Sequence, residues 1–497
     1  MKIRYILAID QGTSATKGVL FDEQGGLVGR HNESHRQFYP KPGWVEHDPE
    51  EIYKNTVKAI KGVLNDTGVL PCDVAAIAIS NQRETAIVWD GVTGKPIYNA
   101  IVWQCGRGAG ICSLLEKQGF EATVRDKTGL ILSPFFSAAK IKWILDNVKG
   151  AREKAKHGQL KCGTVDSWLI YRLTEGVEHA TDYSNASRTQ LFNIKTLKWD
   201  NGLLDIFTIP LTMLPEVKSS DAIFGYTDCE GFFDKPVPIA GVLGDSHAAL
   251  FGQNCFDKGM VKVTYGTGSS IMMNIGEDYI KSKKGLVTSL AWAIGGRVEY
   301  VFEGNINFSG ATIKWLVDEL ELISDPKEAG GLASSVNDNG GVYLVPAFTG
   351  LSAPYWDNDS RALITGLTRG TKKAHVVRAA EESIAYQVKD IVDLMAEESG
   401  IASKELRVDG GPTRDDFLMQ FQSDMLSTRV IRNKIEEISA AGAAYMSGLA
   451  LGFWRNKKEL ETLRSDDKIF YNSMDSMQTT ALYKGWKSAV ERTMFKA

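Results

Sequence analysis

Two short stretches, about half a chain apart, combine glycine with small hydroxyl side chains directly after an apolar run. The first run, residues 5–9, predicts a buried strand, and it leads into residues that could grip a polyphosphate: Asp10, Gly12, Thr13, Ser14 and Lys17. Glycine lets the backbone fold close to an anion, while the freed amides, the two hydroxyls and the ammonium group attract it. The carboxylate of Asp10 could hold the magnesium ion that accompanies polyphosphate. The predicted chemistry is binding of a metal–polyphosphate complex.

A second copy of this pattern appears where residues 263–265 enter the turn 266–270, a strand followed by glycine and hydroxyl residues. Taken alone, such a turn is equally well explained as part of an ordinary β-hairpin. The repetition favours two related half-domains that face one nucleotide. After the first turn, residues 18–21 predict another strand and not a helix, which excludes the Walker and Rossmann types of phosphate loop.

A run of polar residues, 81–85, follows a predicted buried strand. Ligands of α/β proteins bind beyond the carboxyl ends of strands, so Arg83 and Glu84 are candidate substrate ligands. A hairpin over residues 87–103 would return the indole of Trp103 toward them. Charged donors and acceptors beside a flat apolar face suit a polyhydroxylated molecule. The alternative is a solvated loop with an incidental ion pair.

A further acid, Asp245, stands between a predicted strand at 237–243 and a helix that begins near Ala248. Because it lies between the two phosphate turns in sequence, it is a candidate for orienting the hydroxyl group of a substrate. The alternative is a helix N-cap, the commoner role of a lone Asp at a helix start. The polar segment 181–189 is predicted to form a structured loop near the cleft, or else a polar surface loop.

The remaining patterns supply the elements that must position these residues. A third glycine turn, residues 409–412, could take the ribose and base edge of a nucleoside without a side chain in the way. Further strands are predicted at 74–80, 342–348 and 406–408, and helices at 50–64, 136–147, 164–173, 375–398, 417–425 and 436–454.

Length and charge narrow the class of protein. At 497 residues the chain exceeds one hydrophobic core, so we expect two domains, residues 1–253 and 254–497, divided just before the second phosphate strand. Lysine and arginine number 57 against 61 aspartates and glutamates, for a net charge of −4. This balance points away from nucleic acid and membrane surfaces and toward small, freely diffusing partners.

The cysteine pattern and the hydropathy of the sequence indicate the cellular compartment in which the protein is expected. The six cysteines show no CxxC spacing, which argues against a zinc site or a disulfide framework and for a reducing cytoplasm. No stretch is apolar enough to predict a membrane span or a secretion signal, so a cytoplasmic protein is expected. The oligomeric state stays open, a homo-oligomer included.

In combination, these motifs resemble those of the FGGY family of carbohydrate kinases, within the actin, Hsp70 and hexokinase superfamily, and its glycerol-phosphorylating members most of all. The resemblance covers essentially the whole chain and rests on these stretches: DQGTSATK, SNQRETAIVWD, YNAIVWQ, FFSAAKIKWILDN, TDYSNASRTQLFNI, YGTG, VPAFTGLSAPYWD, DGG and FLMQFQSDML. It implies two RNase H-like (actin/hexokinase-type) α/β domains with a nucleotide cleft between them. It also implies transfer of the γ-phosphoryl group of ATP, with Mg²⁺, to a hydroxyl group of a small polyol or sugar.

The resemblance further implies roles for single residues. Asp10 matches the magnesium-associated acid and Asp245 the catalytic base. Contacts to the nucleotide are implied for Thr13, Ser14, Lys17, Thr267, Gly310, Lys314, Gly411 and Asp415. Substrate binding is implied for Arg83, Glu84, Trp103, Phe135, Asp245, Ser246 and Ser270.

Five of these positions depart from the glycerol-phosphorylating members. Phe135 replaces Tyr, Ser246 replaces Gln, and Ser270 replaces an aromatic residue. At the adenosine end, Lys314 and Asp415 stand where those members have Gln and Asn. Loss of an aromatic side chain predicts a larger pocket, in which serines could bind added hydroxyl groups. We therefore expect a four- or five-carbon polyol or ketose to be phosphorylated at a primary hydroxyl. The alternative is glycerol, which would give glycerol 3-phosphate.

Two other classes of protein could use the same phosphate turns. An actin- or Hsp70-like ATPase would use them to drive a conformational change, but it has no need for Arg83, Glu84 and Trp103. A catalytically silent sugar sensor would keep the fold without turnover, whereas Asp10 and Asp245 are both present here. Release of ADP with and without a polyol separates these classes from a kinase.

Overall fold

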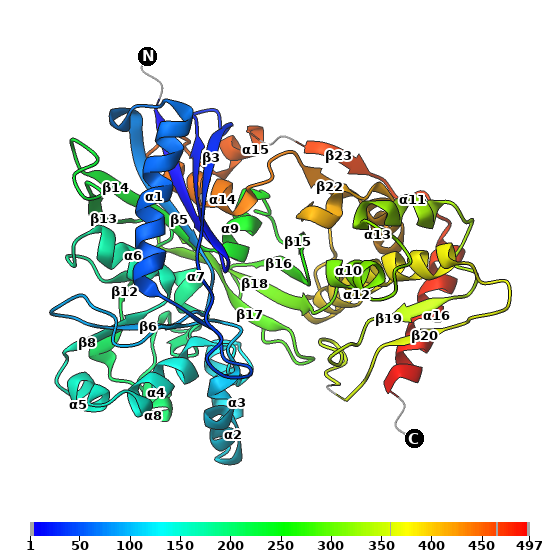
Figure 1. Ribbon diagram of the computed structural model, residues 1–497, viewed down its shortest axis with the longest axis horizontal. Coiled ribbons are helices and arrows are strands. Elements are labelled where there is room, and N and C mark those ends of the chain that lie inside the picture. Colours follow the sequence, from blue (N-terminus) through cyan, green and yellow to red (C-terminus); the bar gives the residue numbers. More distant parts are fainter. Residues whose placement is uncertain (1–3, 358, 464–465, 495–497) are drawn as a thin grey trace.

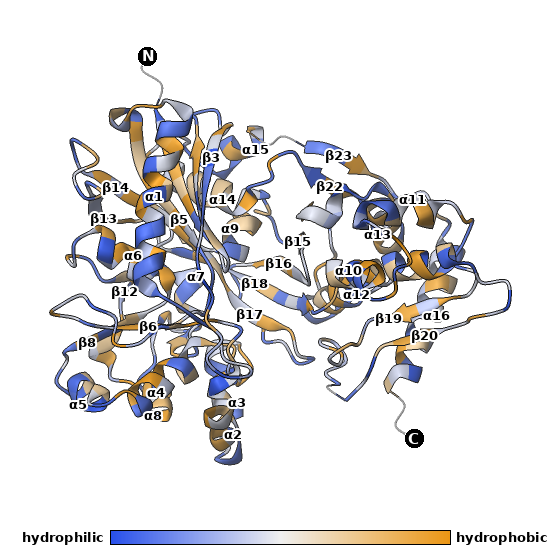
Figure 2. Ribbon diagram, in the orientation of Figure 1, coloured by the Kyte–Doolittle hydropathy of each residue, from blue (hydrophilic) through white to orange (hydrophobic). Residues whose placement is uncertain are grey.

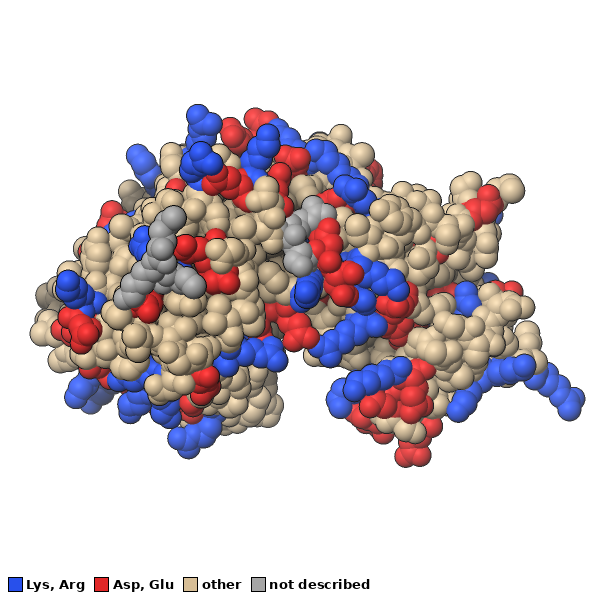
Figure 3. All heavy atoms as spheres, turned by 90° about the horizontal axis from the view of Figure 1, so that it is seen from above, with Lys and Arg blue, Asp and Glu red and all other residues tan. Residues whose placement is uncertain are grey.

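The computed structural model describes residues 4–357, 359–463 and 466–494. Two mixed β-sheets form the centre of the molecule, one in each half, and helices cover them (Figure 1). The first half, blue to green in Figure 1, lies on the left, and most of the second half lies on the right. The space-filling view in Figure 3 shows a notch between the two bodies, with charged side chains along its rims.

The first sheet has six strands in the order β13-β14-β5-β1-β2-β3. Their bounds are β1 Tyr5–Gln11, β2 Ala15–Phe21, β3 Leu27–Ser34, β5 Val74–Asn81, β13 Ile223–Thr227 and β14 Val237–Gly244. β1, β2 and β3 are antiparallel, whereas β5 runs parallel to β1 and β14 runs parallel to β5. In β1, Leu7 and Ile9 join one buried cluster and Ile6 and Ala8 another, which explains why this strand is apolar throughout.

The second sheet has seven strands in the order β17-β18-β16-β15-β21-β22-β23. Their bounds are β15 Met260–Tyr265, β16 Ser269–Gly276, β17 Val287–Ile294, β18 Arg297–Ile306, β21 Glu405–Asp409, β22 Val430–Asn433 and β23 Asp466–Phe470. An antiparallel unit of β15, β16 and β18 is again extended by two parallel strands, β21 and β22. The repeated topology confirms two RNase H-like domains, because each sheet has the same hairpin and parallel extension.

Short strand pairs and helices complete the fold. The pairs are β4 Glu46–His47 with β7 Ala100–Ile101, β6 Ile87–Asp90 with β8 Leu160–Gly163, β9 Ala180–Asp182 with β12 Glu216–Lys218, β10 Phe192–Asn193 with β11 Lys198–Trp199, and β19 Tyr343–Val345 with β20 Leu363–Thr365. The helices are α1 Pro49–Thr67, α2 Ala109–Lys117, α3 Glu121–Thr128, α4 Ser137–Asn147, α5 Ala151–Lys156, α6 Val165–Leu173, α7 Tyr183–Ala186, α8 Asn201–Phe207, α9 Asp245–Gly252, α10 Gly310–Asp318, α11 Ala329–Ser334, α12 Lys373–Ser399, α13 Asp416–Leu426, α14 Ile438–Ala450, α15 Lys457–Thr462 and α16 Ser476–Met494. No helix in the described ranges is long and apolar enough to cross a membrane.

Local sequence signals define the ends of α1, which packs against β2 and β3. The side chain of Asp48 caps its first turn by accepting from the amide of Glu50, Pro49 occupies the first helical position, and Gly68 ends the helix at a φ of 71°. Figure 2 shows the polar side of α1 in blue and the strands that it covers mostly in orange.

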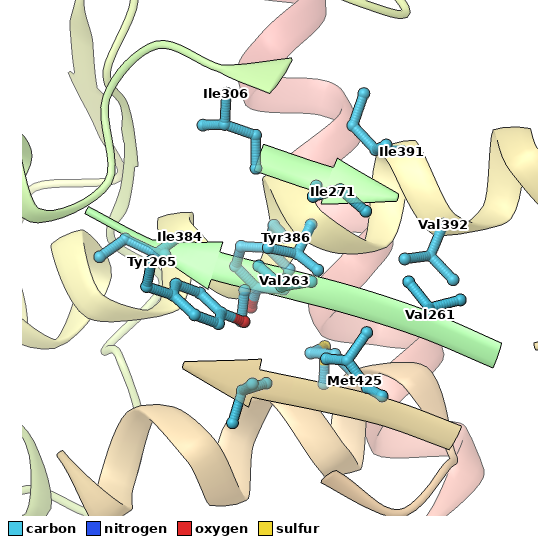
Figure 4. Close-up of a cluster of buried hydrophobic side chains, with 14 of the residues drawn as sticks. Val261, Val263, Tyr265, Ile271, Ile306, Ile384, Tyr386, Ile391, Val392 and Met425 are labelled. Carbon is cyan, nitrogen blue, oxygen red and sulfur yellow. The ribbon is translucent and has the colours of Figure 1, made fainter. Parts of the chain in front are cut away.

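The second sheet is held by an apolar cluster on the face covered by α12. Val261, Val263 and Tyr265 of β15 are buried, as are Ile384 and Ile391 of the helix. Figure 4 shows these side chains between the strands and α12. The burial of these side chains holds β15 in place, and the second phosphate turn, residues 266–270, begins directly after this strand.

Two helices cross between the halves. α14 packs on β1, β5 and β14 of the first sheet, while α9 packs against β15, β16 and β17 of the second. The two helices touch so closely that a Cβ on Gly442 would lie 1.8 Å from the carbonyl oxygen of Ala248. Glycine is therefore required at this position, and the contact joins the two domains through one buried cluster.

Two predictions about loops need correction in detail. The segment 87–103 turns back on itself as predicted, because antiparallel bridges from Ala86 to Ile101 and from Trp89 to Pro96 join its arms, and the amide of Trp103 donates to Thr85. Its strands, however, also have distant partners, since β6 pairs with β8 and β7 pairs with β4. The segment 181–189 is not a loop throughout, because it contains the end of β9 and the short helix α7, and nearly all of it is buried.

Candidate active site

The first phosphate turn is rigid and is tied to the polar cluster beside it. The amide of Gly12 donates to the carbonyl oxygen of Ala15 at 2.9 Å. The side chain of Gln82 donates to the carbonyl oxygen of Gly12 at 3.2 Å. The indole of Trp103 donates to the Thr13 hydroxyl at 3.0 Å. The predicted polyphosphate and substrate sites are therefore neighbours.

Asp10 lies at the end of β1, opposite Lys17 of β2. Burial raises the pKa of its carboxyl group to about 6, although Lys17 opposes this shift. Lys17 itself forms an ion pair at 2.6 Å with Glu437, the residue that precedes α14. Ser14 is exposed at the tip of the turn. The turn thus presents the carboxylate of Asp10, the ammonium group of Lys17 and the exposed hydroxyl of Ser14.

Arg83 connects the first domain to Asp245 and to the second sheet. Its Nε donates to Asp245 at 3.1 Å, and its two Nη atoms donate to Glu303 of β18 at 2.9 and 3.0 Å. A guanidinium group has five N–H donors, so two remain for the hydroxyl groups of a ligand. Asp245 is the first residue of α9 and follows the capping position held by Gly244, so the N-cap alternative does not describe it.

A second arginine completes this buried ion network. Arg188, just beyond α7, contacts Glu303 at 2.9 Å and donates from Nε to Glu84 at 2.6 Å. Burial alone would raise the pKa of Glu303, but Arg188 and Arg83 outweigh it and hold that pKa below its usual range. Burial raises the pKa of the Glu84 carboxyl despite the same two cations. Three carboxylates and two guanidinium groups thus fix one another.

The backbone at Glu84 is strained. Its φ is 60°, in the left-handed region that a non-glycine residue seldom adopts. Its carbonyl oxygen accepts a hydrogen bond from Ser137 at 3.0 Å, which helps to hold this conformation. Strain of this kind is concentrated at functional sites, where it aims a side chain that regular structure would not.

The walls of the substrate region differ in character. Trp103 and Phe135 pack edge to face, with ring centroids 5.5 Å apart, and form an apolar wall. Ser246 and Ser270 face each other with 3.5 Å between their hydroxyl oxygens. Ser270 pairs across strands with Asn305, which is exposed. One wall therefore suits carbon–hydrogen surface, and the other suits hydroxyl groups.

The second phosphate turn and two further glycines converge on one place. The amide of Gly310 donates to the carbonyl oxygen of Gly266 at 2.9 Å, and Thr267 lies exposed between them in the turn. A Cβ on Gly410 would lie 1.9 Å from the carbonyl oxygen of Tyr265, so the adjacent Gly411 is brought against the same turn. Only backbone without side chains permits this approach.

Beside these glycines lies a cavity of about 640 Å³ between α10, α11, α12 and α13. It is lined by Gly310, Gly411, Asp415, Phe417 and Glu381, among others. Asp415 also caps α13 by accepting from the amides of Phe417 and Leu418. Its size and position suit the nucleoside part of a nucleotide whose phosphates lie at the turns. Lys314 does not line this cavity; it is exposed and pairs with Asp318 at 2.9 Å.

The site also fits a magnesium ion shared with a nucleotide. In the described part of the chain, no group of three or more metal-ligating side chains is assembled. Magnesium, however, is typically bound by one or two carboxylates together with substrate phosphates and water. Among the described residues, Ser80 is the side-chain hydrogen-bond donor to the Asp10 carboxyl, at 3.1 Å, and this carboxyl lies close enough to Asp245 for their charges to interact. The carboxylate of Asp10 is therefore a suitable protein ligand for a magnesium ion that is also bound by nucleotide phosphates and water.

Sequence reasoning missed Glu303, Arg188 and Lys262. Glu303 lies within β18, a strand that also carries Arg297 and Glu299, so its charge alone did not mark it as a functional residue. Arg188 was part of a segment recognised as polar but not assigned a role. Lys262 is a buried cation in β15 that donates to Thr264 at 3.0 Å, and burial lowers its pKa.

Comparison with known proteins gave consistent matches along the chain. A model of the N-terminal domain of the FGGY family of carbohydrate kinases matches residues 5–252, and the model of the C-terminal domain of that family matches residues 261–451. The glycerol kinase of Alkaliphilus metalliredigens (strain QYMF) is 53% identical over 491 residues, which cover 99% of this chain and 98% of that protein.

Solved structures agree with the fold described above. The crystal structure of Plasmodium falciparum glycerol kinase with ADP has a TM-score of 0.94 at 38% identity and covers 100% of this chain and 99% of that one. A ligand-bound xylulose kinase from Lactobacillus acidophilus has a TM-score of 0.88 at 23% identity, covering 98% and 97% of the two chains. At 23% identity, the similarity to the xylulose kinase shows a shared fold and nothing about the substrate.

Proposed function

Because the chain belongs to the FGGY family of carbohydrate kinases, we propose that it transfers the γ-phosphoryl group of ATP to a primary hydroxyl group of glycerol. The observation that carries the proposal is the position of Asp245. Its carboxylate is held by Arg83, and the indole of Trp103 joins the same cluster to the first phosphate turn. Kinases that phosphorylate glycerol are the relatives with high identity, which favours glycerol over the four- or five-carbon substrate expected from the pocket residues.

In this proposal Asp245 is the catalytic base. Its carboxylate accepts the proton of the primary hydroxyl as the oxygen attacks the γ-phosphorus of ATP. The bond from that phosphorus to the bridging oxygen breaks, and ADP leaves with the electron pair. Arg83 keeps Asp245 in place and offers its two remaining N–H groups to the substrate, while Glu84 accepts from another hydroxyl. Trp103 and Phe135 lie against the carbon chain.

The nucleotide is proposed to bind across the two phosphate turns. Thr13, Ser14 and Lys17 contact its phosphates from the first domain, and Thr267 contacts them from the second. Gly310, Gly411 and Asp415 border the nucleoside cavity, and Lys314 flanks it from the exposed side of α10. A magnesium ion held by Asp10 would neutralise phosphate charge. We further propose that residues 1–253 and 254–497 are the two bodies that close over these ligands, and that the protein acts in the cytoplasm.

A larger substrate is the second candidate, supported by one observation. Ser246, next to Asp245 in the chain, faces Ser270, whose cross-strand neighbour Asn305 is exposed, so hydroxyl and amide groups gather there. Such groups could bind the additional hydroxyls of a four- or five-carbon polyol or ketose, and glycerol would leave them facing water. A silent sensor finds no support, because the acids and both phosphate turns are in place.

A coupled assay of ADP release tests these candidates. Glycerol, erythritol, xylitol, arabitol, xylulose and ribulose are compared at matched concentrations with ATP and magnesium. Glycerol is expected to show the highest kcat/KM. A tenfold preference for erythritol or a pentulose would establish the second candidate, and ADP release that no polyol stimulates would refute both.

A further inference from the structure

One of the acidic residues that line the nucleoside cavity has a carboxyl oxygen without a partner in the described part of the chain. Glu381 lies on α12, lines the cavity, and is only 3% exposed. Its Oε2 has no hydrogen-bond partner among the described residues. The adjacent Glu382 differs, because it accepts from Arg378 at 2.7 Å and from Asn339 at 3.0 Å. A buried polar atom without a partner is destabilising, so its presence in a cavity points to a ligand.

The protonation state of Glu381 defines which ligand groups it can bind. Burial raises the pKa of this carboxyl well above its usual value, and the nearby Asp415 raises it further. Both effects favour the protonated, neutral form of this group. A neutral carboxyl group presents one O–H donor and one carbonyl acceptor side by side, as the amide of glutamine does.

The base of a nucleotide offers the matching pattern. Adenine carries a 6-amino donor beside the acceptor N7, and amide side chains pair with these two atoms at once. Hypoxanthine and guanine carry a 6-oxo acceptor beside N7, so one of two neighbouring acceptors would face the carbonyl oxygen of the carboxyl group. We propose that Glu381 selects adenine over oxopurines by pairing with the 6-amino group and N7 of the base. This inference rests on the proposed use of ATP at this cavity.

Direct binding of nucleotides tests the inference without relying on turnover. The dissociation constants of ADP, IDP and 7-deaza-ADP are measured for the wild-type protein and for Glu381→Gln and Glu381→Leu. The wild-type protein should bind ADP about ten- to a hundredfold more tightly than IDP, with 7-deaza-ADP between them, as expected for one or two hydrogen bonds to a buried partner. Glu381→Gln should keep this order because the amide preserves the donor and the acceptor.

Glu381→Leu should bind the three nucleotides within about threefold of one another. It is expected to fold at least as well as the wild type, because it removes an unpartnered buried carboxyl, and thermal unfolding checks this. Glu397→Leu, an exposed position on the same helix, is the matched control and should leave all three affinities unchanged.

Two results would overturn the inference: an unchanged ADP-to-IDP ratio in Glu381→Leu, or 7-deaza-ADP binding as tightly as ADP in the wild-type protein. Failure of the proposed function looks different. In that case no polyol stimulates ADP release, while the selectivity of binding can still be measured.

Discussion

Asp245 is the residue on which the proposed chemistry depends most directly. Exchange to asparagine keeps its shape and the hydrogen bond from Arg83 but removes the group that accepts the proton. We expect Asp245→Asn to lower kcat by about two to four orders of magnitude, the range for loss of a positioned acid or base, with little change in ADP affinity. Steady-state kinetics and nucleotide titration measure the two quantities. Wild-type kcat in the variant would show that the residue has only a structural role.

Asp10 should show a conflict between stability and activity. Its pKa is raised to about 6, so the folded state binds a proton more readily than the unfolded state between about pH 4 and 6. Stability therefore falls as the pH rises through this window, and the ionised carboxylate destabilises the free protein at neutral pH. Removing this charge should therefore stabilise the fold. Because solvent screens a partly exposed side chain, we expect the gain from Asp10→Asn to be about 1 to 3 kcal/mol.

The same substitution removes the proposed magnesium ligand. Turnover with ATP and magnesium should fall at least about a hundredfold in Asp10→Asn, and kcat/KM of the wild type should decrease as the pH falls below about 6. Thermal unfolding in the absence of nucleotide and a pH–rate profile test both statements. A less stable Asp10→Asn variant would contradict the electrostatic argument.

At the residue scale, sequence reasoning identified groups that stand at strand ends and missed those inside strands. Arg83, Glu84 and Asp245 follow buried strands, where a polar residue is unexpected unless it binds something. Glu303 and Lys262 lie within strands, and their role depends on which residues of the other domain lie opposite them. No pattern along the chain encodes that relation.

The strand β18 brings the second sheet into the substrate site. Glu303 of this strand contacts both Arg83 and Arg188, so we expect Glu303→Gln to raise the KM for the polyol about ten- to a hundredfold by releasing Arg83. Loss of one partner from a buried ion network should also destabilise the fold by about 3 to 5 kcal/mol. The affinity for ADP should stay near the wild-type value, because the nucleoside cavity is elsewhere.

Glu299→Gln is the matched control on the same strand. Glu299 pairs with Lys457 and accepts from Asn274, and it has no contact with Arg83 or Arg188 among the described interactions. Its exchange should leave the KM for the polyol unchanged and destabilise the fold less than Glu303→Gln does. If both variants behaved alike, the network around Glu303 would have no special role in holding the substrate.

Elements whose pattern is local were predicted well, and those with distant partners were not. The helices α1, α4, α12 and α13 follow clear apolar periodicity and appear close to their expected bounds. The segment 87–103 shows the opposite, since its strands pair with β4 and β8, which lie outside the local sequence. Pairing of short strands is decided by the surrounding tertiary structure.

At the scale of the whole molecule, the two phosphate turns belong to different sheets yet are proposed to hold one nucleotide. Binding of polyol together with a non-hydrolysable ATP analogue should therefore draw the halves together. Small-angle scattering is expected to show a smaller radius of gyration than for the free protein, whereas ADP alone should cause a lesser change. An identical radius in all states would contradict closure between residues 1–253 and 254–497.

The ion network around Glu303 also constrains how this protein can evolve. Its members come from the ends of β5 and α7, the start of α9 and the middle of β18, so a mutation in any of them disturbs the folding of several segments at once. Phe135, Ser246 and Ser270 are only partly buried, and their side chains make few bonds. Substitutions at these three positions should therefore change the substrate specificity with the least damage to folding. A directed-evolution library should randomise them and leave the charged residues intact.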